Sequence, residues 1–360
     1  MRIPIYIALA LVTSMCARAQ EASTSSSPTA GRVDWNHFPI VMYDTDVGFG
    51  GGYKTVLRNA LGSQESFDLT LFASTKGERW VRLGASWPDA ELRQGSEYPF
   101  ALDVVLDYDK MISNSFFGVG DHSRFDDREM YTFEPLEITA AVSRGFTPSL
   151  VAAATLRFKR IWSYGYEAGS SMPANPLNAG TCDITSAALQ LRYDTRTSVL
   201  QPTAGMVLQA DVEQALPVTD FAKEWTRLAG WAQYYTEMWD AVVAARFGMQ
   251  ALIGDDIPIQ HLLPIGGNNT VRGIPKDRFL DRVSAVGNLE FRFPVYHRLG
   301  GVLGVDAGAV SHEFADIASS RWIVTPVAGL RYYLPTFVVR ADVGWSNEAV
   351  GVYFNFGQIF

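Results

Sequence analysis

The chain has 360 residues, of which 48% are hydrophobic, 12% aromatic and 19% charged, and its formal net charge is −8. This aromatic content excludes a disordered chain, because a chain of this length can bury a sizeable core. The acidic balance excludes a dedicated nucleic-acid binder, and two cysteines are too few for a disulfide scaffold or a multi-cysteine zinc domain.

The first residues have the pattern of a secretory signal peptide. Arg2 supplies a positive start, residues 3–12 are largely apolar, and Ala17-Arg18-Ala19 is an A-x-A cleavage site. We predict that residues 1–19 are removed by cleavage after Ala19, which changes the net charge to −10 and leaves Cys182 as the sole cysteine. After residue 19 no apolar run approaches 18 residues, which excludes a helical membrane protein.

Two further expectations concern the same region. A lipoprotein anchored at Cys16 is disfavoured, because Met15 is too large for the residue before a lipidated cysteine. Residues 20–36 are predicted to form a flexible polar leader, since 21–30 is rich in Ser, Thr and Pro. Cys182 cannot form an internal disulfide after cleavage, and a free, shielded thiol is the expectation.

From about residue 37 onward, apolar and polar residues alternate with a period of two, which indicates β-strands. Residues 337–345 near the C-terminus show this clearly, and turn residues separate the runs. An even number of strands suits the closure of an antiparallel barrel. The sixteen predicted strands are 37–44, 47–58, 66–75, 79–88, 99–109, 131–145, 148–160, 183–195, 204–215, 222–236, 239–252, 283–295, 300–311, 322–333, 336–346 and 350–360. No amphipathic helix is predicted.

Two all-β architectures give this pattern. A soluble sandwich or propeller has one buried and one polar face, whereas a transmembrane barrel has an apolar lipid face and a lumen of small and charged residues. Strand length, the signal peptide, the small and charged inward sets and aromatic residues at strand ends favour the barrel. These aromatic residues are Trp80, Trp87, Trp322 and Tyr333. We therefore predict an all-β, sixteen-stranded antiparallel transmembrane β-barrel over residues 37–360.

The end of the chain resembles the terminal aromatic signal of Gram-negative outer-membrane barrels. The predicted last strand places Phe354, Phe356 and Phe360 on the lipid face. This signal and the signal peptide predict the cell outer membrane as the location. With both chain ends periplasmic, the long connections 110–130, 161–182 and 253–282 fall outside.

Residues 264–273 read Pro-Ile-Gly-Gly-Asn-Asn-Thr-Val-Arg-Gly. This segment resembles the G-G-x-x-[ST]-V-R-G-[FY] loop of the outer-membrane barrel superfamily that contains BamA, TamA and the bacterial surface antigens. Ile274 stands where that family has an aromatic residue. Segments 193–205 and 288–294 resemble a periplasmic turn and the twelfth strand of the same family, so the resemblance covers the chain from about residue 37. The motif residues are Gly266, Gly267, Thr270, Val271, Arg272 and Gly273.

Period-two alternation places Glu290 and Asp306 in the lumen, since their neighbours along each strand are apolar. Two carboxylates in a narrow barrel need a cation, and the planar fork of an arginine is suited to both. From the residues alone, the favoured interpretation is that Arg272 is a solvated loop residue and that both acids face lumen water. The family resemblance implies that loop 253–282 folds into the lumen and that Arg272 pairs with Glu290 and Asp306.

Signatures of enzymatic chemistry are absent from the sequence. There is no G-x-S-x-G elbow, and the glycine run 48–52 is not followed by a helix that could bind phosphate. The histidines lack metal-site spacing, and acidic loop residues are expected to be solvated rather than to hold Ca²⁺. The histidines are His37, His122, His261, His297 and His312. We predict no catalytic residue, no metal, no cofactor and no enzymatic activity.

The family resemblance implies a seam between the first and last strands and a role in protein or lipid insertion or translocation. Family insertases carry periplasmic POTRA domains, for which the roughly 17 residues before the first strand are too few, so a member without them is predicted. A passive small-solute pore, a surface antigen, or the barrel subunit of a complex with a separate periplasmic partner are the alternatives. Expected partners are outer-membrane lipids and lipopolysaccharide, with unfolded outer-membrane proteins or a periplasmic protein as further candidates, and no nucleic acid.

Overall fold

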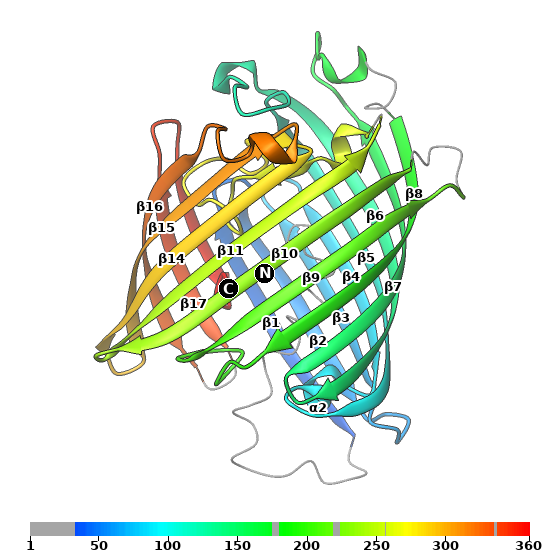
Figure 1. Cartoon of the computed structure of the whole chain (residues 1–360), viewed down its shortest axis with the longest axis vertical. Helices are drawn as coiled ribbons and strands as arrows, with labels where there is room; N and C mark the ends of the chain where they lie inside the picture. The colour runs from blue at the N-terminus through cyan, green and yellow to red at the C-terminus, as the bar shows by residue number, and fades with distance from the viewer. Residues whose placement is uncertain (1–32, 175–179, 219–223, 256, 335–336) are drawn as a thin grey trace.

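The computed structural model describes residues 33–174, 180–218, 224–255, 257–334 and 337–360. The predicted signal peptide and residues 20–32 of the predicted leader lie outside them. Within these residues, sixteen strands form a closed antiparallel barrel in chain order, with the last strand next to the first (Figure 1). They are β1 (Asp34–Asp44), β2 (Gly48–Arg58), β3 (Ser66–Ser74), β4 (Arg79–Trp87), β5 (Tyr98–Phe116), β6 (Glu129–Thr147), β7 (Leu150–Tyr164), β8 (Gly180–Asp194), β9 (Gly205–Leu216), β10 (Trp225–Met238), β11 (Ala241–Gly254), β14 (Val283–Tyr296), β15 (Leu299–Ser311), β16 (Ile323–Tyr333), β17 (Val338–Trp345) and β18 (Val350–Phe356).

The predicted sixteen-stranded all-β barrel is confirmed, and the alternation of side chains explains it. Along β14, Leu289 is exposed on the outer wall, whereas Glu290 and Arg292 are buried in the lumen. β9 repeats the pattern, with Leu208 exposed and Gln209 buried. Because successive side chains of a strand point to opposite faces, the apolar set forms the lipid face and the polar set fills the lumen.

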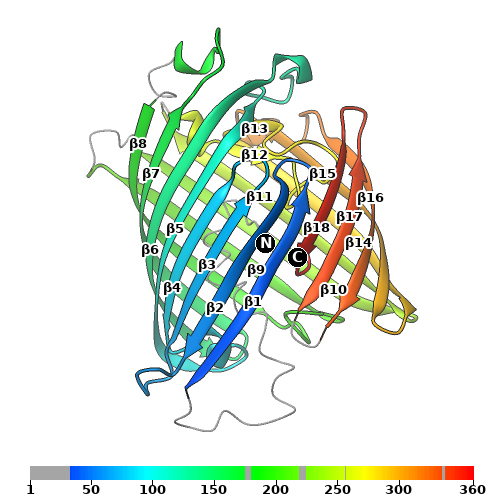
Figure 2. The same cartoon turned by 180° about the vertical axis from the view of Figure 1, so that it is seen from behind.

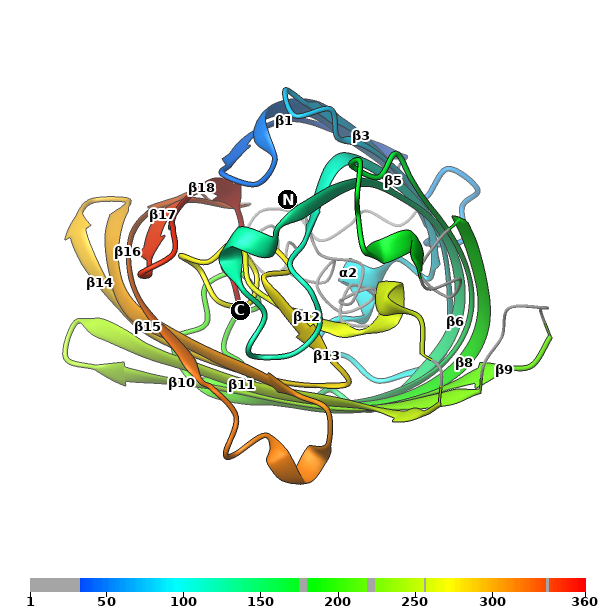
Figure 3. The ribbon, with the colours of Figure 1, turned by 90° about the horizontal axis from the view of Figure 1, so that it is seen from above.

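Short turns gather at one end of the barrel and longer connections at the other. Connections 148–149 and 239–240 mark the turn end, and 117–128 and 255–282 mark the loop end, which is uppermost in Figure 1. Residues 257–282, here called the lumenal loop, fold into the barrel (Figure 3). At the base of this loop, β12 (Leu263–Ile265) and β13 (Phe279–Asp281) form a separate two-stranded sheet.

Several features of the elements differ from the prediction. β1 begins at Asp34, so residues 34–36, which were predicted to belong to the flexible leader, pair with β2 as part of the barrel. β5 and β6 extend further toward the loop end than predicted, because a register shift between Met111 and Asn114 lets them continue pairing through a polar stretch. A short helix, α2 (Ala90–Arg93), follows β4; Asp89 caps it, and Arg93 pairs with Asp103 at 2.6 Å. One helical turn is too short to produce a periodic signal. Among the described residues, no helix is long and apolar enough to cross a membrane.

Candidate functional site

The lumenal loop is fixed to the inner wall by an apolar cluster. Ile265, Val271, Ile274 and Phe279 from the loop are almost completely buried, and they pack with Val286 of β14 and Val310 of β15. The isoleucine that replaces the family's aromatic residue therefore still takes part in packing. Burial of this kind stabilises by about 1.5–3 kcal/mol for each large side chain, so the position of the loop is well determined.

Arg272 lies fully buried at the centre of the site, in contact with three carboxylates. Its Nε is 2.7 Å from Asp306 Oδ2, and its Nη1 is 2.8 Å from Glu290 Oε1. The same Nη1 donates to Asp342 Oδ2 at 2.9 Å, and the backbone N–H of Arg272 donates to Asp306 Oδ2 at 3.0 Å. The guanidinium thus joins the loop to β14, β15 and β17 through charge-assisted hydrogen bonds.

Four further arginines surround this centre, and together with Arg272, Glu290, Asp306 and Asp342 they form what we call the arginine cluster. Arg292 donates to Glu290 Oε2 at 2.8 Å, and Arg331 donates to Asp342. Because arginines outnumber carboxylates here, donors remain for other acceptors. The four additional arginines are Arg246 (β11), Arg292 (β14), Arg331 (β16) and Arg340 (β17).

The remaining donors of the cluster bind the last residues of the chain. Arg331 Nε donates to Gln358 Oε1 at 2.9 Å, Arg246 Nη1 to the Ile359 carbonyl at 3.3 Å, and Arg292 Nη2 to the Phe360 carbonyl at 3.1 Å. The Phe360 ring is buried near Tyr235. Residues 357–360, the C-terminal segment, therefore lie in the lumen.

The prediction that the last strand runs to residue 360 with Phe360 on the lipid face is wrong. β18 ends at Phe356, and Gly357 adopts φ +82°, a left-handed conformation that favours glycine and redirects the chain inward. The outward position of Phe354 agrees with the structure, where it is exposed, and Phe356 is half-buried. The physical reason for the difference is that lumenal arginines donate hydrogen bonds to the carbonyl groups of Ile359 and Phe360.

The seam between β1 and β18 has few backbone pairs. Two residue pairs join these strands in the described residues, Tyr43 with Phe354 and Asp44 with Tyr353. By contrast, β1 shares eleven pairs with β2, and β17 shares seven with β18. Residues 34–42 of β1 pair with β2 along one edge. Because the C-terminal segment turns inward, no described strand pairs with their other edge, which faces β18. Figure 2 shows β1 and β18 diverging toward the turn end.

The lumenal loop contacts both sides of this seam. On the β18 side, the Gly273 N–H donates to Tyr353 Oη at 3.3 Å, and Arg278 Nε lies 2.6 Å from Glu348 Oε2. On the β1 side, the Lys276 N–H donates to Asp46 Oδ2 at 3.1 Å in the β1–β2 hairpin. One loop thus connects the arginine cluster to both edges of the seam.

The structure brings together most of the predicted site residues. Gly273 passes so close to β17 that a Cβ there would lie 2.5 Å from the Trp345 nitrogen, which explains the requirement for glycine. The sequence-based prediction did not include Asp342, Arg331 and Arg340 in the site. The alternation of side chains along β16 and β17 places all three in the lumen, which is a signal that could have found them. The prediction also missed Arg246, because nothing local links a β11 arginine to the end of the chain.

The predicted absence of metal chemistry remains an expectation. No group of three or more His, Cys, Asp or Glu in the described part of the chain could hold a metal ion. Cys182 is buried and its Sγ lies 3.8 Å from His261 Nε2. Phe72 packs across the glycine run of β2, where a Cβ at Gly50 would meet its ring at 2.0 Å, so these glycines permit close packing.

A closed barrel with an apolar outer wall, a polar lumen and a lumenal loop defines an outer-membrane β-barrel. The Omp85 superfamily domain matches residues 49–360. The chain belongs to the Omp85 superfamily, whose barrels are transport and assembly proteins.

Solved structures show the same fold. The crystal structure of BamA from Haemophilus ducreyi lacking POTRA domains 1–3 has a TM-score of 0.67 at 13% identity, covering 90% of this chain and 70% of that one. CdiB from Escherichia coli has a TM-score of 0.65 at 14% identity, covering 92% and 63%, and CdiB from Acinetobacter baumannii has 0.56 at 12%, covering 90% and 65%. The chain thus spans somewhat less than two thirds of either CdiB chain. No curated protein matches the sequence.

Proposed function

We propose that this barrel assists the insertion or translocation of proteins or lipids at the outer membrane, with the seam as its working part. The observation that carries the proposal is the pairing of β1 with β18 through two residue pairs. An unsatisfied backbone group in hydrocarbon costs several kcal/mol. The free edge of β1 therefore offers hydrogen-bonding groups to an incoming strand, as in β-strand addition.

The lumenal loop gives this seam a means of control. Its contacts with Asp46, Tyr353 and Glu348 reach both seam edges, and Arg272 anchors the loop in the arginine cluster. We infer that the loop sets how far the two edges separate. The partners that fit this role are unfolded outer-membrane proteins as clients, a periplasmic protein, and the surrounding lipids and lipopolysaccharide.

The passive-pore alternative has less support. The lumenal loop, α2 and the C-terminal segment all lie inside the barrel (Figure 3), and the arginine cluster packs the loop against the wall. These segments obstruct a path for small solutes along the barrel axis. A role as the barrel subunit of a complex is compatible with the proposed seam function.

The proposal is tested by measuring the folding rate of urea-denatured outer-membrane barrels in proteoliposomes that contain this protein. Liposomes with an unrelated barrel of similar size are the control. We expect faster client folding with this protein and a loss of the acceleration in Arg272→Glu, which places a fourth acid among three carboxylates. Arg128→Glu, at an exposed loop residue, should retain it. Client folding no faster than with the control barrel would refute an autonomous insertase.

A further inference from the structure

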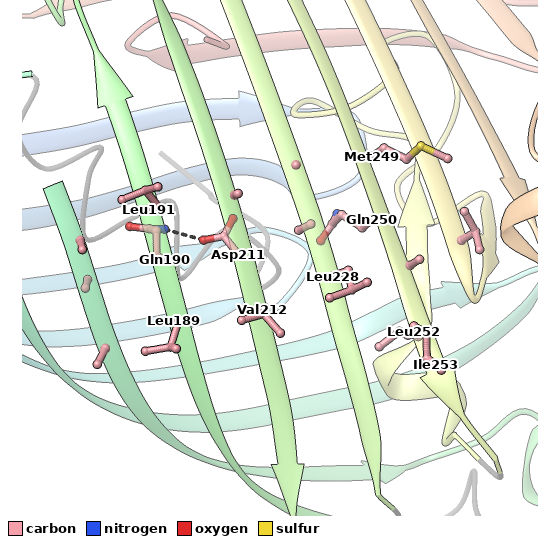
Figure 4. A pocket seen from close by; sticks show the side chains of 18 of the residues that line it. Leu189, Gln190, Leu191, Asp211, Val212, Leu228, Met249, Gln250, Leu252 and Ile253 are labelled. Carbon is pink, nitrogen blue, oxygen red and sulfur yellow. Dashed lines mark hydrogen bonds between the residues drawn. The ribbon is translucent and has the colours of Figure 1, made fainter. Parts of the chain in front are cut away.

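The outer wall carries a groove of about 1570 Å³ across strands β6 to β11 (Figure 4). Leu189, Leu191 and Leu228 line it with large exposed surfaces, 61%, 50% and 45% respectively. Gln190 and Asp211 alternate with them along the strands, and these side chains are buried on the lumenal side. The groove therefore faces the lipid. The strands that carry it form the wall opposite the seam between β1 and β18 (Figures 1 and 2).

The floor of this groove includes three small residues, Ala152, Ala210 and Gly230. Successive cross-strand partners make one straight row through it, namely Arg144, Ala152, Leu191, Ala210, Gly230 and Met249. Since neighbouring strands are about 4.8 Å apart, this row of six is about 24 Å long. Because barrel strands are tilted by about 35–45°, the row crosses about half of the roughly 30 Å hydrocarbon core, which is the depth of one leaflet. A Cβ at Gly230 would meet no atom within 4 Å, so the floor is open to a ligand.

At the loop end, connection 312–322 closes the groove from outside. Its Ile317 packs on the outward-facing Ala251, Ala285 and Ala309, which it buries. Figure 3 shows this connection outside the barrel wall. His312, Glu313 and Phe314 from the connection, together with Asp255 and Arg282, line this end of the groove. Arg282 donates to the Gly254 carbonyl at 2.9 Å, and the two carboxylates outnumber it, so the net negative charge of this end disfavours an anionic headgroup.

At the turn end, the groove is lined by an outward-facing arginine. Arg144 lies three residues before the end of β6, is exposed, and has its guanidinium 5.1 Å from the Phe146 ring centroid. No ion pair joins it to an acid in the described chain, and Phe100 lies beside it in the groove. An arginine on the lipid face is strongly destabilising at the midplane of the membrane and nearly neutral at its interface. This position therefore suits a cation at headgroup level.

We propose that this groove binds one phospholipid of the leaflet at the turn end. Arg144 binds the phosphate, and an acyl chain runs from Ala152 past the Leu191 side chain and over Ala210 and Gly230 toward connection 312–322. The charge difference between the two ends sets this orientation. The site is independent of the proposed seam function, because it lies on other strands and includes none of the arginine cluster.

Native mass spectrometry of the purified barrel with added palmitoyl-oleoyl phosphatidylglycerol tests the proposal. We expect one saturable equivalent for the wild type, and at least tenfold weaker binding for Arg144→Gln and for Gly230→Leu, which fills the floor. Arg79→Gln, an exposed arginine at the start of β4 on the opposite rim, is the matched control and should bind as the wild type does.

Two comparison ligands test whether binding depends on the phosphate and on the leaflet from which the lipid comes. Palmitoyl-oleoyl glycerol, which lacks the phosphate, should bind weakly and should not distinguish Arg144→Gln from the wild type. Lipid A, from the opposite leaflet, should not compete. Non-saturable phosphatidylglycerol retention that is equal in all variants, or preferential retention of lipid A, would overturn the proposal. Folding of each variant is checked by the heat-modified shift of the barrel on gels.

Discussion

At the scale of single residues, the arginine cluster owes its geometry to the donor pattern of guanidinium. Arg272 uses its Nε, its Nη groups and its backbone N–H to hold Asp306, Glu290 and Asp342, which a lysine with a point charge could not reproduce. All four residues are fully or almost fully buried. Removal of one partner from a buried ionic network leaves charge uncompensated and is strongly destabilising.

The first prediction concerns Arg272→Ala. Three carboxylates lose a shared cation, so we expect a loss of about 3–5 kcal/mol in unfolding free energy and a lower urea midpoint. The measurement is urea unfolding in detergent or liposomes followed by the heat-modified gel shift. Arg128→Ala, which removes an exposed arginine bonded to Ser115, serves as control. An unfolding midpoint equal to that of the wild type would contradict the account.

The second prediction concerns pH and the β1–β2 hairpin. Burial and the neighbouring Asp44 raise the pKa of Asp46 from 3.8 to about 7, with Lys276 opposing the shift and Asp277 adding to it. A raised pKa means that the folded state binds the proton more tightly. The stabilising contribution of protonated Asp46 to the free energy of unfolding is therefore fully present below about pH 4 and is lost as pH rises through about 7.

We accordingly expect Asp46→Asn to flatten the pH dependence of stability between pH 4 and 8 and to be more stable than the wild type at pH 8. Asparagine keeps an oxygen that can accept from the Lys276 N–H. Urea midpoints of both proteins at pH 5 and pH 8 provide the check. A pH dependence that is identical in the two proteins would show that Asp46 does not titrate in this range.

At the scale of elements, the C-terminal segment shows how a short piece of chain depends on distant strands. Gly357 turns the chain, and donors from β11, β14 and β16 hold it. The Phe360 ring lies 5.2 Å and 5.0 Å from the guanidinium carbons of Arg246 and Arg292, within the range of cation–π contacts. The shortened β18 is the direct cause of the weak seam.

The third prediction follows from this anchoring. In Phe360→Ala the ring's burial and both cation–π contacts are lost, so the C-terminal segment should leave the lumen more often. The position of the segment is measured with the variant Gln358→Cys in a Cys182→Ser background, whose single cysteine reacts with maleimide when it leaves the lumen. The rate of maleimide labelling should rise several-fold when Phe360→Ala is added. Equal labelling rates with and without the Phe360 ring would show that the ring does not hold the segment.

Local pattern and long-range contact explain what the sequence could and could not predict. The sixteen strands and the inward parity of Glu290 and Asp306 follow from alternation within each strand, so they were predictable. The course of residues 357–360 was not, because the arginines that bind them lie 27 to 113 residues away. The third carboxylate, Asp342, lies on the correct face of its strand, but only barrel closure brings it to Arg272.

At the scale of the whole molecule, the barrel has two different walls. On one side, the seam joins β1 and β18 through two residue pairs and is spanned by the lumenal loop. On the other side, β6 to β11 are continuously paired, with ten or more residue pairs at every interface. A barrel built this way opens most easily at the seam, because the fewest backbone hydrogen bonds are lost there.

The most direct test of the central claim is client folding with the seam locked by a disulfide. Tyr43 and Phe354 are opposed across the seam, so Tyr43→Cys with Phe354→Cys in a Cys182→Ser background can form the lock, as direct cross-strand partners lie within disulfide range. Val343→Cys with Val352→Cys, opposed between β17 and β18, is the matched control. We predict that the oxidised seam lock abolishes accelerated client folding, that reduction restores it, and that the control lock has no effect. Acceleration that persists with the seam fully cross-linked would contradict the account.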